Sequence, residues 1–242
     1  MSTQIAGPVH IAGQQVLSSS AVQMHNLGEI GFSNDGRAFK YVKNGAVAMV
    51  QGKLYQAPAE FTNHQNLTPV AAAIGAVEVT TTLGATAAAA NQYAGGLLVV
   101  TVTPGEGYAY KIRSHAAIGS GGTGTFVLED GLFVALTTSS RIDLVAAPTS
   151  GVIVNPTTAS SAPVGAAVYP IAASEYGWLQ IKGQASLLAD GAITVGTNVI
   201  ASNATAGAVE AGADAADLQA NVGVALSGIA TTEYGPVMLN LF

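Results

Sequence analysis

The chain has 242 residues, of which 49% are hydrophobic and 9% are charged, whereas an average soluble domain is roughly 25% charged. This composition excludes an intrinsically disordered chain, because disorder requires low hydrophobicity and high net charge. The 8 Lys and Arg against 14 Asp and Glu give a net charge of −6, which argues against nucleic-acid binding, and the lack of cysteine excludes disulfides and thiolate metal sites.

The apolar composition does not indicate membrane-spanning segments. The longest stretches without charge, 79–105 and 144–174, are interrupted by Thr, Ser, Asn, Gly and Pro, and therefore favour β structure in water. No basic residue precedes Arg37 and no compact apolar run follows Met1. We therefore expect no cleaved export signal, and synthesis in a cytoplasm.

Residues 1–36 are rich in Gln, Ser and Gly, carry almost no charge and show weak periodicity. This pattern predicts an extended N-terminal arm that becomes ordered by adding backbone hydrogen bonds to a strand edge of a partner. The candidate contact residues are apolar side chains of the arm: Ile5, Val9, Ile11, Val16 and Val22.

Residues 37–147 are predicted to form a first β domain. Arg37–Lys43 and 46–50 flank Asn44-Gly45, the strongest short signal for a hairpin turn. Further strands are predicted in runs rich in Val, Ile and Thr, here and in the C-terminal part: Val77–Thr82, Leu97–Thr103, Tyr108–Arg113, Thr125–Leu128, Arg141–Val145, Tyr176–Ile181, Val222–Leu226 and Pro236–Leu241. Many short strands with turn signals between them predict an all-β fold of small barrels or sandwiches.

A Pro-rich connector is predicted at 148–170, and a C-terminal β-barrel domain at 171–242. Helical signals are few and short, at 69–74, 87–93 and 214–220. The one internal similarity that we detect, between Asn44-Gly45-Ala46-Val47 and Asp190-Gly191-Ala192-Ile193, is too short to indicate a duplication.

No set of residues has the spacing of a catalytic, cofactor or metal site. The histidines are isolated from one another: His10, His25, His64 and His115. A turn explains the acidic residues near a predicted hairpin better than paired-carboxylate chemistry does: Glu129, Asp130 and Asp143. The Gly-rich run 119–124 lacks the lysine and the helix of a phosphate loop. We therefore expect no enzyme, no cofactor and no metal, and Trp178 is interpreted as a core residue or an anchor for a partner.

Three groups of segments, taken in chain order, carry a resemblance to known proteins. The opening segments are Leu27-Gly28-Glu29-Ile30-Gly31, Asp35-Gly36-Arg37-Ala38-Phe39-Lys40-Tyr41-Val42 and Gly52-Lys53-Leu54-Tyr55-Gln56. The middle segments are 106–113, 127–130 and 135–140, and the C-terminal segments are 175–183, 222–226 and 237–240. In this order the segments resemble tailed-phage structural proteins of the head, and the C-terminal ones are similar to the small β barrel of capsid decoration proteins.

The resemblance implies a decoration, or cement, protein on the outer face of an icosahedral head. Such a protein is typically a homotrimer at local threefold sites, and its partner is the major capsid protein. The acidic charge agrees with a place away from packaged DNA, and the low charge agrees with large apolar interfaces. Two alternatives stay open: a tail, baseplate or fibre-associated virion subunit, and a carbohydrate-binding or depolymerase module.

Overall fold

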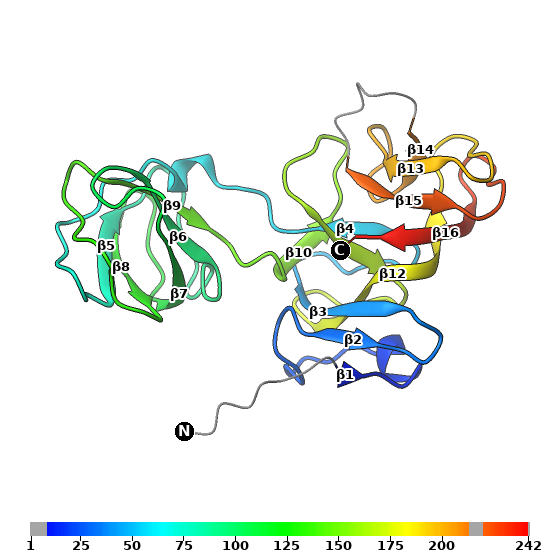
Figure 1. The fold of residues 1–242 in the computed structure, drawn as a ribbon, viewed down its shortest axis with the longest axis horizontal. Coiled ribbons are helices and arrows are strands. Elements are labelled where there is room, and N and C mark those ends of the chain that lie inside the picture. Colours follow the sequence, from blue (N-terminus) through cyan, green and yellow to red (C-terminus); the bar gives the residue numbers. More distant parts are fainter. Residues whose placement is uncertain (1–8, 213–219, 242) are drawn as a thin grey trace. The chain divides into compact units, whose positions relative to one another are not determined.

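The computed structural model describes residues 9–212 and 220–241, and its chain folds as an all-β protein, as predicted. The chain divides into two compact units, unit 1 (Met1–Pro58 and Pro148–Phe242) and unit 2 (Ala59–Ala147). In Figure 1 unit 2 carries β5 to β9, and unit 1 carries the remaining strands. The helical elements of the described residues are two single 3-10 turns, η1 (Gln15–Leu17) and η2 (Thr62–His64). None of the described residues forms a helix that is long and apolar enough to cross a membrane.

Unit 2 is a closed five-stranded barrel with the strand order β5-β8-β7-β6-β9. Its strands are β5 (Glu78–Thr82), β6 (Leu97–Val102), β7 (Ala109–His115), β8 (Thr123–Leu128) and β9 (Arg141–Val145). The segment that precedes β5 joins the two outer strands, because Leu67 pairs with Ile142 of β9 and Pro69 pairs with Thr81 of β5. Alternating side chains from each strand fill the interior, and Tyr93 and Phe126 are among the largest of them.

Unit 1 contains the other strands: β1 (Val9–His10), β2 (Ile30–Phe32), β3 (Ala38–Asn44), β4 (Leu54–Gln56), β10 (Ser150–Val154), β11 (Pro163–Ala167), β12 (Tyr176–Leu188), β13 (Asn198–Ala201), β14 (Val209–Ala211), β15 (Asn221–Ala225) and β16 (Tyr234–Asn240). Because β3 pairs with both β10 and β12, the strands β3, β10, β4, β11 and β12 form a closed ring. We call this ring the first barrel. Val42, Met49, Tyr55 and Leu179 are in its core.

A second barrel begins within β12, which is 13 residues long. The C-terminal half of β12 pairs with β16, and β15, β13 and β14 follow in order. A parallel bridge between Ala189, directly after β12, and Val209 of β14 brings the two ends of this group together. At the passage from one barrel to the other, Gly183 has a φ of +89°, and a Cβ there would lie 2.9 Å from Cγ of Arg37. A side chain is therefore excluded where the shared strand turns.

The two barrels of unit 1 repeat the same topology. Each barrel has five strands, and strands with the same rank in chain order occupy the same place in the two rings. The strands of the first barrel are β3, β4, β10, β11 and β12. In this order they correspond to the C-terminal half of β12 and to β13, β14, β15 and β16 of the second barrel. The corresponding pairs are antiparallel in both barrels, except for the parallel contact that closes each ring. Corresponding segments also share residues. Val164-Gly165 and Ala167 in the first barrel match Val222-Gly223 and Ala225 in the second. Ile171-Ala172 and Glu175-Tyr176-Gly177 match Ile229-Ala230 and Glu233-Tyr234-Gly235.

Equivalent backbone hydrogen bonds support this correspondence. Gly52 N donates to Ala167 O at 2.7 Å, and Gly196 N donates to Ala225 O at 2.9 Å. Ala57 N donates to Ala162 O, and Ala201 N to Ala220 O, both at 3.0 Å. The short similarity noted in the sequence lies where β3 and β12 end, although the hydrogen bonds match Asn44 with Ala189 rather than with Asp190. Unit 1 is thus an internal duplication, which our sequence comparison did not detect.

The observed division differs from the predicted domain boundaries. Unit 2 ends at Ala147, as predicted for the first β domain, but residues 37–58 belong to unit 1. The predicted connector 148–170 contains β10 and β11, which lie between other strands of the first barrel. Prolines are tolerated there because Pro163 is the first residue of β11. Residues 171–242, predicted as a separate C-terminal domain, belong to unit 1, and the second barrel shares β12 with the first.

The hairpin predicted at Asn44-Gly45 is wrong. The Asn44 side-chain amide donates to the carbonyl oxygens of Val47, Ile171 and Ala172, each at 2.9 Å, and so holds an irregular loop at 45–50. The neighbours of β3 are β2, β10 and β12. The helices predicted at 69–74 and 87–93 are also wrong, because Ala72 and Ala88 make bridges to Leu136 and Ile118 instead. The helix predicted at 214–220 falls outside the described residues, apart from residue 220.

Candidate interaction surface

The outer surface of the second barrel carries a row of exposed apolar side chains. Along β12 and β16 alternate residues point into the core, among them Leu187, Val237 and Leu239, and the residues between them point outward. The outward residues lie opposite one another in register: Gln184 and Met238, Ser186 and Pro236, Leu188 and Tyr234, and Val224 of β15 beside Met238. We call the group Gln184, Ser186, Val224, Leu226, Tyr234, Pro236 and Met238 the β12–β16 face.

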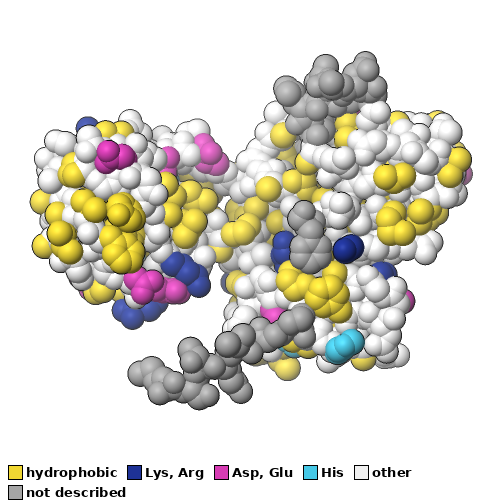
Figure 2. All heavy atoms as spheres, viewed as in Figure 1, with side chains coloured by type: hydrophobic (Ala, Val, Ile, Leu, Met, Phe, Trp, Pro, Cys, Tyr) yellow, Lys and Arg dark blue, Asp and Glu magenta, His cyan; other side chains and the backbone are white. Residues whose placement is uncertain are grey.

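Four apolar side chains of this face are strongly exposed. The exposed fractions are 42% for Val224, 39% for Leu226, 51% for Tyr234 and 44% for Met238. Single exposed hydrophobic residues are normal on proteins, whereas a cluster on neighbouring strands marks a contact site. Figure 2 shows that most side chains on the visible surface are uncharged and that charged side chains are few.

Two hollows lie along the β12–β16 face and share Arg37 and Gln184 in their walls. One has a volume of about 870 Å³ and is bordered by Val224 and Met238, and by the amides of Asn198, Asn221 and Asn240. The other has a volume of about 570 Å³ and is bordered by Ser186, Tyr234 and Pro236. The face is therefore concave, with apolar side chains and neutral amides in its walls, and with Asp35, Arg37 and Lys182 at the border of the larger hollow.

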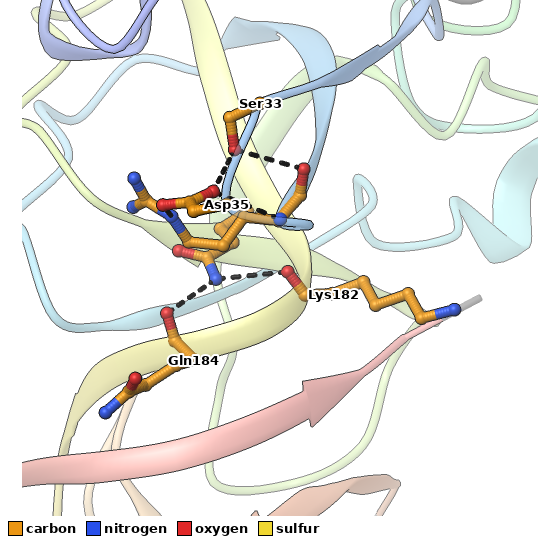
Figure 3. A network of polar contacts seen from close by, with 6 residues as sticks. Ser33, Asp35, Lys182 and Gln184 are labelled. Carbon is orange, nitrogen blue, oxygen red and sulfur yellow. Dashed lines mark hydrogen bonds and ion pairs between the residues drawn. The ribbon is translucent and has the colours of Figure 1, made fainter.

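The turn between β2 and β3 supplies a charged border to both hollows. Figure 3 shows the Ser33 hydroxyl beside the Asp35 carboxylate, which also accepts a hydrogen bond from Arg37 Nε at 2.7 Å. The Ser33 hydroxyl, and secondarily Arg37, lower the pKa of Asp35 to about 2. The Arg37 guanidinium is thus already neutralised by its neighbour and is held in place at the edge of the face.

A buried glutamine stabilises β12 where it passes between the barrels. The Gln180 side-chain amide donates to the carbonyl oxygens of Lys182, at 3.1 Å, and of Gln184, at 2.9 Å, as drawn in Figure 3. Gln180 is 0% exposed and forms part of the wall of the 570 Å³ hollow. Its carbonyl oxygen Oε1 has no hydrogen-bond partner among the described residues. The Gln180 side chain thus holds the turn of β12 in place beside the hollow.

Unit 2 exposes two aromatic rings of its own. Tyr108 and Phe133 are 43% and 64% exposed, and their ring centroids are 5.8 Å apart. Both stack on Tyr110, which is 2% exposed and accepts a hydrogen bond on its hydroxyl from Phe133 N at 3.1 Å. The buried Tyr110 thus fixes the two exposed rings in place.

Two buried histidines of unit 2 have both ring nitrogens paired within the barrel. His64 contacts the Tyr93 hydroxyl through Nδ1 and donates from Nε2 to Thr86 O at 2.8 Å. His115 accepts from Tyr93 N at Nε2, at 3.0 Å, and donates from Nδ1 to Ala116 O at 2.8 Å. Burial raises the pKa of Tyr93 to about 12 and lowers the pKa of His115. The two histidines and the tyrosine are therefore structural.

The candidate contact residues of the arm lie mostly against the chain's own body. Ile11 and Val16 are 4% and 2% exposed, and they pack on Phe39, Tyr41 and Trp178. Val9 is partly buried in β1, which pairs with β2, and Val22 is 67% exposed. Ile5 lies outside the described residues. Of the four candidates that the structure describes, Val22 is therefore the most accessible to a partner, and removal of residues 9–26 would uncover the first barrel.

The other residues singled out from the sequence are dispersed. Trp178 is 3% exposed beneath residues of the arm, which agrees with a role in the core. Glu129 forms an ion pair with Lys111 at 3.3 Å, and Asp143 accepts from Asn66 N at 2.7 Å, so these carboxylates have separate structural partners. Within the described ranges, no group of three His, Asp or Glu residues is placed to hold a metal ion.

The sequence analysis did not identify the β12–β16 face. Its signal is the alternation in Tyr234-Gly235-Pro236-Val237-Met238-Leu239-Asn240, in which both sets of alternate positions contain apolar residues. This pattern is typical of a strand with a core on one side and a contact on the other. A scan against protein-family models, a search of curated proteins and a search of solved structures each found no match to the chain.

Proposed function

We propose that this chain is a virion structural protein, a capsid decoration protein that binds the outer surface of an icosahedral phage head and stabilises it through contacts with the major capsid protein. The observation that carries the proposal is the β12–β16 face, a concave row of exposed apolar side chains on a closed barrel. The resemblance in sequence supplies the kind of partner, and the face supplies a surface for it.

The chemistry of the face fits a protein partner. Interface cores are enriched in Tyr, Met and Arg and depleted in Lys, Glu and Asp, and their margins are polar. Tyr234, Met238 and Arg37 border the hollows here, and exposed Asn198, Asn221 and Asn240 surround them. The net charge of −6 favours the outer surface of a head over its DNA-filled interior.

Self-association into a homotrimer around a threefold axis is part of this proposal. A chain with only 9% charged residues is suited to large apolar contacts with copies of itself and with the capsid. We expect the purified protein to have three times the mass of the chain in light scattering. A monomer at micromolar concentration would contradict this part of the proposal.

The decisive experiment locates the protein on phage particles. Immunogold electron microscopy of particles from cells that carry the gene should label the head surface, and label confined to the tail would instead support a tail, baseplate or fibre subunit.

The variants Val224→Lys and Met238→Lys should reduce attachment to empty heads at least tenfold, because each places an ammonium group in the contact. Val195→Lys is the matched control, since Val195 is 60% exposed in the same barrel and borders neither hollow.

Attachment should be largely insensitive to moderate salt. The contact contains few ion pairs, and salt screens exposed charges while leaving apolar burial intact. We expect the amount of protein on heads, measured by sedimentation, to change less than about twofold between 50 and 500 mM NaCl. Release over this range would contradict an apolar contact.

One observation favours a second candidate function, a carbohydrate-binding module. Tyr108 and Phe133 present two fixed, exposed rings, and such rings pack on the apolar faces of sugars. Binding of the purified protein to a glycan array, lost in Phe133→Ala, would favour this candidate. Binding to heads that is unchanged in Phe133→Ala would favour the decoration protein.

A further inference from the structure

The duplication in unit 1 makes it possible to compare two equivalent outer faces in one chain. On the first barrel, the outward residues Phe39, Tyr41 and Trp178 are 0%, 3% and 3% exposed. Residues of the N-terminal segment cover them, with Ile11 and Val16 in the same buried cluster and Leu27 packed against it. The chain therefore places a cover of its own on this face.

The cover also pairs with the backbone of the first barrel. Ser20 N donates to Tyr176 O at 3.0 Å, and Tyr176 N donates to Ser20 O at 2.9 Å, in an antiparallel bridge at the start of β12. These groups of Tyr176 point away from β3, because Asn44 N bonds instead to the preceding carbonyl, Glu175 O, at 2.8 Å. The covering segment thus combines apolar side chains with one strand-like pair of hydrogen bonds.

Among residues 9–212 and 220–241, no equivalent segment covers the same face of the second barrel. The register between β12 and β3 in the first barrel matches the register between β16 and β12 in the second. Gln184, Ser186 and Pro236 therefore occupy, in that order, the places of Phe39, Tyr41 and Trp178. Tyr234 occupies the place of Tyr176, and its ring is 51% exposed. Ala189 N bonds to Glu233 O at 2.8 Å, as Asn44 N does to Glu175 O, so the register directs the N–H and C=O of Tyr234 away from β12.

The substitutions between the two faces indicate what would fit on the second one. Three large aromatic side chains are replaced by an amide, a hydroxymethyl group and a proline ring, and hollows of about 870 and 570 Å³ lie over them. Small side chains on the face require large ones on the occupant, because interfaces pack to the density of protein interiors.

We propose that the β12–β16 face binds a segment of a partner protein that carries bulky apolar side chains and pairs its backbone with Tyr234, in the way that residues 11–20 cover the first barrel. The identity of the partner rests on the proposed function, which makes it the major capsid protein. The occupant is a chain segment, because a segment is what the equivalent face of this molecule binds, and a strand edge with side-chain hollows is a known form of peptide recognition.

A synthetic peptide with the sequence of residues 9–22 of this chain tests the proposal, together with a second peptide that carries Ile11→Trp and Val16→Trp. Titrated into the full-length protein, the tryptophan peptide should bind at least about tenfold more tightly than the first, since it fills the hollows. The perturbed amide signals in NMR spectra should include Tyr234 and Met238. Equal affinities, perturbations elsewhere, or no binding by either peptide at millimolar concentration would overturn the proposal.

The variant Ser186→Trp fills the hollow from within the protein and should weaken binding of the tryptophan peptide at least about tenfold. Val195→Trp, in the same barrel but outside both hollows, is the matched control and should leave binding unchanged. A Ser186→Trp protein that is folded by circular dichroism yet binds the peptide normally would also overturn the proposal.

The same variant separates this inference from the proposed function. If Ser186→Trp protein attaches to heads as well as the wild type does, the segment proposal fails and the decoration function stands. If the wild type is absent from heads but binds the tryptophan peptide at Tyr234 and Met238, the decoration function fails and the docking site stands for another partner.

Discussion

The protonation state of the buried His115 side chain affects the stability of unit 2. Its Nε2 accepts a hydrogen bond from Tyr93 N, and its ring packs on Phe126 at a centroid distance of 4.8 Å. Protonation at Nε2 would replace this acceptor with a second donor that faces the Tyr93 N–H. Burial is the main cause that lowers the pKa of His115 below its ordinary value of 6.5, and His64 adds to the effect.

The lowered pKa predicts that unit 2 is less stable in acid. The unfolded chain binds a proton near the ordinary pKa of histidine, whereas folded His115 binds one only at lower pH, so its contribution to stability is complete above about pH 6.5 and decreases as the pH falls toward the folded value. The free energy of unfolding of unit 2, from hydrogen exchange of barrel amides, should therefore decrease between pH 8 and pH 5.

The variant His115→Gln should weaken this pH dependence, because a glutamine does not titrate. His25→Gln is the control, since His25 lies in unit 1 beside Glu29. If His115→Gln and the wild type lose stability equally between pH 8 and pH 5, another group accounts for the acid sensitivity. If the His115→Gln protein does not fold, titration of the His115 ring in the wild type by NMR tests the same idea. The pKa of His115 should then lie below 6.5.

At the scale of the element, the repeated hairpins depend on two glycines. Gly177 and Gly235 follow the tyrosines that open β12 and β16, and each lies against an isoleucine just upstream. A Cβ would lie 2.6 Å from Ile171 Cδ1 in the first case and 2.5 Å from Ile229 Cγ1 in the second. Close approach of the isoleucine, rather than an unusual backbone angle, explains both glycines.

Gly235→Ala should destabilise the second barrel by about 1–3 kcal/mol, the usual cost of extra volume in a packed core. Ile229→Ala creates the missing space, so in that background Gly235→Ala should cost less than about 0.5 kcal/mol. Chemical denaturation of the four proteins measures this coupling. Gly228→Ala is the control, since a Cβ there meets nothing closer than 3.9 Å. Additive effects of the two substitutions would contradict the steric explanation.

The sequence predicted those elements whose own residues carry a period of two. Strands β5 to β9, β12, β15 and β16 overlap the predicted runs of Val, Ile and Thr, although the run predicted for β12 ends at Ile181 and omits its C-terminal half. By contrast, β4, β10, β11, β13 and β14 have three to five residues and few alternating positions, so local pattern is weak. Their strand state comes from neighbours far away in the chain, as in the pairing of Ile153 with Gln56.

The candidate site was missed for a related reason. The sequence places Tyr234, Pro236 and Met238 on one side of a strand, but it does not show which strands lie beside them or that an N-terminal segment covers the matching side of β12. The sequence predicted an arm that becomes ordered on a partner, whereas Ile11, Val16 and Ser20 lie against the chain's own first barrel.

At the scale of the whole molecule, unit 2 is an insertion into a duplicated structure. The first barrel leaves β4 at Gln56 and returns at Ser150, and unit 2 lies between these points in the chain. In the second barrel the equivalent strands β13 and β14 are joined by residues 202–208 alone. The core of unit 2 consists of residues from Leu67 to Leu144, so its burial does not depend on side chains of unit 1.

The insertion predicts that the two units fold separately. Two glycines in place of residues 59–147 leave seven residues between Ala57 and Val152, as many as lie between the equivalent Ala201 and Val209. We expect each of two proteins, this shortened chain and residues 59–147 expressed alone, to give a β-type circular dichroism spectrum and a single cooperative thermal transition. The reason is that each closes its own hydrogen-bonded barrels.

The shortened chain should also retain binding of the tryptophan peptide, since the β12–β16 face lies entirely in unit 1. A shortened chain that unfolds without cooperativity would show that the first barrel requires the insertion to bring β4 and β10 together.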